Sequence, residues 1–108
     1  MLTLKFGGTS MGSARRILDS VEIMMGRAKA DRISVVVSAV AGVSNKLQAA
    51  IDSCITGGTS TSFVSELRSI HADICAEIKS TVPEFNLDQV TAKIESHLTE
   101  LDKLLAGL

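Results

Sequence analysis

The chain has 108 residues, of which 45% are hydrophobic and 21% are charged; this balance is typical of one folded globular domain and argues against disorder. The formal net charge is -1 and the three aromatic residues are all Phe, so we expect neither nucleic acid nor an anionic membrane as a partner. Cys54 and Cys75 form no CxxC pair, and we interpret them as buried, reduced thiols. No apolar run approaches the roughly 20 residues of a membrane helix, and a cytoplasmic location is expected.

The chain begins with a predicted strand and a predicted helix. Leu2–Phe6 is rich in apolar residues and is ended by Gly7–Gly8, which predicts a short strand. From about 13 to 30 the apolar residues recur at helical spacing. Either Ser10 or Ser13 is a candidate N-cap for this helix.

A second strand and helix follow. Ile33–Val40 reads ISVVVSAV, a β-branched run without clear alternation, which predicts a strand covered on both faces. A helix is predicted from about 44 to 55. Residues 1–55 therefore form a βαβα unit of α/β class, in which the two strands are parallel neighbours joined by a right-handed crossover.

The rest of the chain is predicted to be a helical hairpin. Residues 56–62, TGGTSTS, are interpreted as a linker, and residues 63–108 as two antiparallel helices separated by a turn at Pro83. Asn86, with Gln89 three positions later, resembles a capping box. Because two strands are too few for a doubly covered sheet, we expect either a homo-oligomer that shares the sheet or the front portion of a longer chain.

Two polar loops follow the two strands. Parallel sheets bind ligands at the carboxyl ends of their strands, where KFGGTS and SAVAGVSN both lie. Glycine amides, a helix N-terminus and a lysine together suit an anion. The spacing matches neither GxxxxGK[ST] nor GxGxxG. The residues alone therefore leave two interpretations open, an anion site or an ordinary turn, with Ser38, Ser44 and Asn45 serving as helix caps.

The two loops together carry a resemblance to a known family. LKFGGTS near the start, followed some 30 residues later by VVVSAVAGVSNKL, resembles the aspartokinase family of the amino-acid kinase superfamily, including versions fused to homoserine dehydrogenase. The resemblance implies that 1–108 is the N-terminal portion of an amino-acid kinase catalytic domain, a partial carbamate kinase-like α/β/α sandwich. It also implies ATP-dependent phosphorylation of L-aspartate to 4-phospho-L-aspartate, which leads to lysine, threonine and methionine biosynthesis.

The resemblance implies roles for individual residues. Lys5 would be catalytic and would stabilise the transferring phosphoryl group, while Ser38 and Ser44 would contact aspartate. Ser44 stands where many relatives have Thr, which keeps the hydroxyl. The expected ligands are L-aspartate and ATP with Mg²⁺, although the chain shows no metal ligands. The residues expected to hold the ATP phosphates are Lys5, Gly7, Gly8, Thr9 and Ser10.

Members of that family are several times longer than this chain. The later glutamate motif, the nucleotide-base pocket and the regulatory domains of the family are not found here, so we expect these residues alone to be inactive. Two alternatives remain. One is another amino-acid kinase, acting on glutamate, carbamate or a nucleotide; the other is a non-catalytic module that self-associates through its helical hairpin.

Overall fold

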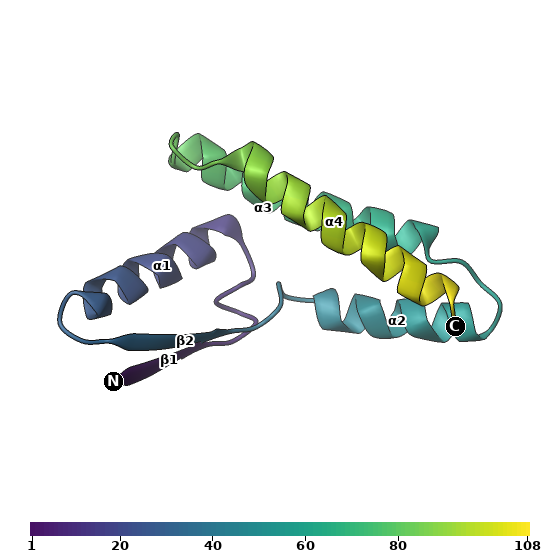
Figure 1. Cartoon of the computed structure of the whole chain (residues 1–108), viewed down its shortest axis with the longest axis horizontal. Coiled ribbons are helices and arrows are strands. Elements are labelled where there is room, and N and C mark those ends of the chain that lie inside the picture. Colours follow the sequence, from purple (N-terminus) through teal and green to yellow (C-terminus); the bar gives the residue numbers. More distant parts are fainter. The chain divides into compact units, whose positions relative to one another are not determined.

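The computed structural model describes residues 1–108 and has the α/β character predicted from the sequence. It forms two compact units, Met1–Gly42 and Val43–Leu108. None of its helices combines the length and the apolarity needed to cross a membrane. In chain order the elements are β1 (Leu2–Phe6), α1 (Ala14–Ala28), β2 (Ile33–Val37), α2 (Val43–Ile55), α3 (Thr61–Thr81) and α4 (Leu87–Ala106) (Figure 1).

The first unit is a parallel strand pair with one helix packed against it. β1 and β2 pair from Leu2↔Ile33 to Phe6↔Val37, which confirms the predicted parallel arrangement. Along β1 half-buried and exposed side chains alternate, and Lys5 belongs to the exposed set. α1 contacts β2 on one side of this small sheet (Figure 1). Because successive side chains of a strand point to opposite faces, Lys5 lies on the face opposite to that of the half-buried β1 residues.

β2 is shorter and more exposed than the sequence predicts. The strand ends at Val37 rather than at 40, because β1 ends at Phe6 and the last ladder bond runs from Ser38 N to Phe6 O at 3.0 Å. The side chains of Val36 and Val37 are 49% and 55% exposed. The expectation of a strand covered on both faces is therefore wrong for this chain, since one helix and one neighbouring strand cannot cover both sides of β2.

Glycine at position 26 weakens the last turn of α1. A Cβ built at Gly26 meets no atom within 4 Å, and its φ is not positive. We expect Gly26→Ala to raise the free energy of unfolding by about 0.5–1 kcal/mol, because alanine loses less backbone entropy on entering a helix. Urea denaturation followed by circular dichroism measures this change. Gly57→Ala is the control, and it should destabilise because Gly57 has φ +92°; a loss of stability in both variants would contradict the prediction.

The second unit contains α2 and the predicted helical hairpin. α3 and α4 lie side by side and run in opposite directions (Figure 1), and α2 contacts both. α3 begins at Thr61, inside the segment expected to be a linker. Ion pairs join Lys46 to Glu66 at 2.9 Å and Arg68 to Glu95 at 2.7 Å. The buried apolar residues of this unit are Val43, Ala50, Val64, Leu67, Cys75, Leu98 and Leu105.

Both cysteines are free thiols, but only Cys75 is buried as the sequence predicts, and Cys54 is half-buried. Cys75 lies in the core of the second unit, where burial raises the pKa of its thiol. A raised pKa keeps the thiol protonated and unreactive at neutral pH.

The start of α4 follows the predicted cap. Asn86 Oδ1 accepts a hydrogen bond from Gln89 N at 3.0 Å. We expect Asn86→Ala to lower the free energy of unfolding by about 1 kcal/mol, because one terminal amide of the helix loses its acceptor. Urea denaturation compares this variant with Asn45→Ala, which removes an exposed asparagine from the first turn of α2. Equal stabilities of the two variants would show that the cap contributes nothing.

Candidate functional site

Lys5 supplies an uncompensated positive charge near the carboxyl end of β1. It is the last residue but one of the strand and pairs with Val36 of β2. Its side chain is exposed, and none of the four ion pairs of the chain includes it. The ammonium group is therefore available to an anion that approaches this end of the sheet.

The loop at 7–10 offers backbone donors. It folds back on itself through Met11 N, which donates to Gly8 O at 3.1 Å. The amides of the last three loop residues donate to no acceptor within the chain. Free consecutive amides in a tight turn form a concavity that binds anions. The loop therefore has the donors that a phosphate group requires.

The two loops singled out in the sequence meet at the carboxyl ends of the strands. Ser38 N donates to Phe6 O at 3.0 Å, which ties the end of β2 to the end of β1. A Cβ built on Gly8 would lie 3.7 Å from Ser38 Oγ. The hydroxyl of Ser38 thus faces the glycine loop, as expected for neighbouring parallel strands.

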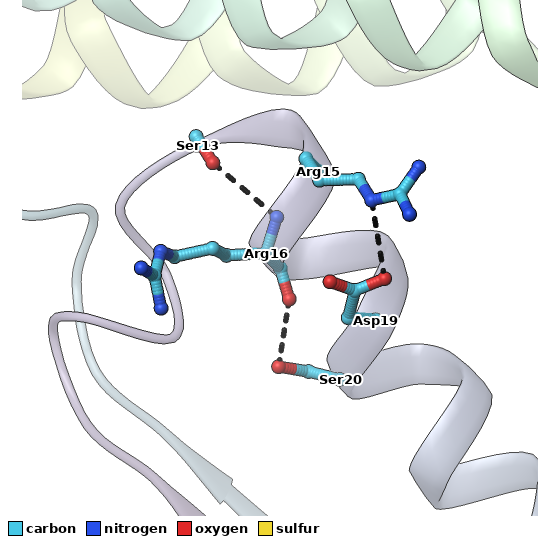
Figure 2. A network of polar contacts seen from close by, with 5 residues as sticks. All are labelled: Ser13, Arg15, Arg16, Asp19 and Ser20. Carbon is cyan, nitrogen blue, oxygen red and sulfur yellow. Dashed lines mark hydrogen bonds and ion pairs between the residues drawn. The ribbon is translucent and has the colours of Figure 1, made fainter.

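The N-terminus of α1 adds further positive potential. Ser13, one of the two candidate caps, accepts a hydrogen bond at Oγ from Arg16 N at 3.3 Å (Figure 2). Arg15 pairs with Asp19, with Nε and Oδ1 3.5 Å apart. The first turn contains no acidic residue, although carboxylates are the favoured residues there. Arg15 and Arg16 are therefore two consecutive cations in the first turn of α1. This pair can be seen in the sequence, but it lies outside the KFGGTS and SAVAGVSN motifs.

Ser44 belongs to the other unit. It lies in the first turn of α2 and its side chain is exposed, whereas Lys5, the 7–10 loop and Ser38 all belong to the first unit. The structure thus brings the glycine loop and Ser38 together, and it places Ser44 at a helix start. Its role in binding a substrate stays a prediction.

The polar groups of the first unit suit phosphate better than a metal ion. They are an ammonium group, free amides, hydroxyls and a guanidinium, all of which can donate hydrogen bonds. Phosphate oxygens need such donors, whereas Mg²⁺ needs oxygen ligands such as carboxylates. Residues 7–18 contain no Asp or Glu. This region could hold the phosphate tail of a nucleotide, but it offers no carboxylate to an accompanying metal ion.

The second unit contains a separate apolar cavity of about 340 Å³. His71 and His97, which the sequence places on different helices, both line it. The His71 ring is held by a hydrogen bond between Nδ1 and Leu67 O at 2.7 Å. The other residues lining the cavity are Val43, Leu47, Leu67, Ile94, Leu98 and Leu101.

Comparison with known proteins finds a similar enzyme. No protein-family model matches the chain. The chain is 27% identical over 108 residues to a bifunctional aspartokinase/homoserine dehydrogenase of Buchnera aphidicola subsp. Acyrthosiphon pisum (strain APS). The match includes all of this chain but only 13% of the length of that relative. The chain is thus similar to part of an enzyme of amino-acid metabolism.

Proposed function

We propose that these residues form the N-terminal portion of the catalytic domain of an aspartate kinase with the amino-acid kinase α/β/α fold. The observation that carries the proposal is the meeting of Ser38 and the glycine loop at the carboxyl ends of β1 and β2. The free amides of that loop support it, as does the similarity to a bifunctional aspartokinase/homoserine dehydrogenase. The proposed reaction transfers the γ-phosphoryl group of ATP to the side-chain carboxylate of L-aspartate.

The proposed chemistry needs charge neutralisation more than proton transfer. A carboxylate oxygen of aspartate attacks the γ-phosphorus, a new P–O bond forms, and the bond to the β,γ-bridging oxygen breaks. The carboxylate is already ionised at neutral pH, so no base is required. The products are 4-phospho-L-aspartate and ADP. Negative charge builds up on the transferring group and on the leaving oxygen, and fixed donors stabilise it.

The residues that the resemblance implies for the site have the following parts in this mechanism. The Lys5 ammonium stabilises charge on the transferring phosphoryl group, and the 7–10 loop binds the phosphates through its amides and through the hydroxyls of Thr9 and Ser10. Ser38 and Ser44 donate hydrogen bonds to aspartate. Mg²⁺ would enter as part of the ATP substrate and would neutralise phosphate charge; residues 7–18 contain no carboxylate that would hold it.

The test is an assay of the complete product of the reading frame that encodes these residues. We expect L-aspartate-dependent release of ADP, with the acyl phosphate trapped as its hydroxamate. L-Glutamate in place of L-aspartate should give no turnover, which separates aspartate kinase from related amino-acid kinases. Absence of turnover with aspartate, or a preference for glutamate, would contradict the proposal. The 108-residue chain alone should be inactive.

The exposed surface of the strand pair favours a second candidate function, self-association in a homo-oligomer. The three valines of β2, Val35, Val36 and Val37, are exposed, and each strand of the pair has an open edge. Unpaired edges and exposed apolar faces favour pairing between copies. Light scattering after size exclusion measures the mass of the chain in solution; a monomer of 11.4 kDa at all concentrations would contradict this function.

A further inference from the structure

We propose that Arg16 is a further phosphate-binding residue, whose guanidinium binds the phosphate tail of the nucleotide beside the 7–10 loop. This inference rests on the proposed function. It adds a residue outside the sequence motifs to the same site. The charge balance, the orientation and the neighbours of Arg16 support this role.

The charge balance of α1 distinguishes Arg16 from Arg15. Both cations lie in the first turn, where the partial positive charge of the helix dipole disfavours them. Arg15 is compensated by Asp19 one turn later. Arg16 is exposed and belongs to none of the ion pairs of the chain. An anion bound at the start of α1 would compensate both the free guanidinium and the helix terminus.

The backbone of Arg16 is held on both sides, which limits where its side chain can reach. Its N–H donates to Ser13 Oγ at 3.3 Å, and its carbonyl oxygen accepts from Ser20 Oγ at 2.9 Å. Ser20 is only 4% exposed. In Figure 2 the two arginines extend from α1 in different directions: Arg15 turns to Asp19, and Arg16 extends to the side on which the preceding loop runs.

That loop supplies complementary donors. The amides of 8–10 have no acceptor within the chain. A guanidinium presents several N–H groups in a planar fork, which matches two phosphate oxygens at once. Arg16 and the loop amides therefore suit the same kind of ligand, a di- or triphosphate. Together they provide a set of hydrogen-bond donors from one short segment of the chain.

The adjacent arginines provide a matched pair of variants in the complete gene product. Arg16→Ala should raise the KM for ATP about tenfold or more, because a charge-assisted hydrogen bond to phosphate is lost. Arg16→Lys should restore part of the affinity, since it keeps the charge and loses the fork. The KM for aspartate should change less than about twofold. Arg15→Ala should leave both constants unchanged, and all variants should melt within about 2 °C of the parent.

A binding measurement on the 108-residue chain separates this inference from the proposed function. We expect added tripolyphosphate to shift the amide resonances of 8–10 in the parent and in Arg15→Ala, with about fivefold weaker binding in Arg16→Ala. Equal binding by the two alanine variants, or no saturable binding by the parent chain, would overturn the role of Arg16. Tripolyphosphate binding that depends on Arg16, in a gene product without aspartate-dependent turnover, would overturn the proposed kinase activity and keep the anion site. An active kinase with equal KM values for ATP in both alanine variants would overturn the role of Arg16 and keep the proposed kinase activity.

Discussion

Replacing Lys5 by methionine is expected to lower kcat of the complete gene product about 10²–10³-fold, the usual effect of removing one fixed donor from a transition state. Methionine keeps a long apolar stem on the exposed face of β1 and removes only the ammonium group. The loss should appear mainly in kcat, since the charge on the transferring group is greatest in the transition state. Steady-state kinetics with ATP and aspartate measure the change.

Thr3→Ala is the control for this prediction. Thr3 is exposed on the same face of β1, two residues further from the carboxyl end of the strand. It should therefore change kcat less than about twofold. If Lys5→Met and Thr3→Ala have the same kcat, while both melt like the parent, Lys5 has no catalytic role. A fall in melting temperature confined to Lys5→Met would instead point to a structural role for its side chain.

Leu67→Ala is expected to cost about 2–5 kcal/mol of unfolding free energy, the range for buried leucines that leave a cavity. Leu67 lies on α3, is 3% exposed, and also lines the apolar cavity among the helices of the second unit. A small folded unit has a small total free energy of unfolding. The substitution should therefore reduce the helical signal at 222 nm as well as the midpoint of urea denaturation.

Leu104→Ala makes the same chemical change at an exposed position of α4. Leu104 is 66% exposed, so its truncation should change the free energy of unfolding by less than about 0.5 kcal/mol. Hydrogen exchange of α3 and α4 amides gives a second measurement that is specific to this unit. Similar stabilities of Leu67→Ala and Leu104→Ala would show that the helical hairpin is not held by the buried leucine.

The element boundaries show which parts of this fold depend only on residues close together in the sequence. β1 has the predicted bounds, Leu2–Phe6, because an apolar run is followed directly by Gly7–Gly8. Both signals come from adjacent residues. The cap at Asn86 was also predictable, since its partner is three positions away. The end of β2 was not predictable from its own residues. A strand continues only as far as its neighbour pairs with it, and the neighbour ends at Phe6.

The same distinction applies to the candidate site. KFGGTS and SAVAGVSN could be recognised as two loops at strand ends, because both the motif and the strand before it are written in consecutive residues. Their meeting depends on the parallel register of the strands, which places Ser38 beside Gly8. The difference between Arg15 and Arg16 also appears only in three dimensions, since it depends on where each side chain extends.

The sequence by itself determined the order of strands and helices, the caps at Ser13 or Ser10 and at Asn86, and the identity of the polar loops, because periodicity, capping and turns depend on residues within a few positions. The tertiary structure decided where β2 ends and how closely Ser38 approaches the glycine loop. Those outcomes depend on partners distant in the chain, and hydrogen bonding and ion pairing are settled only when such partners come into contact.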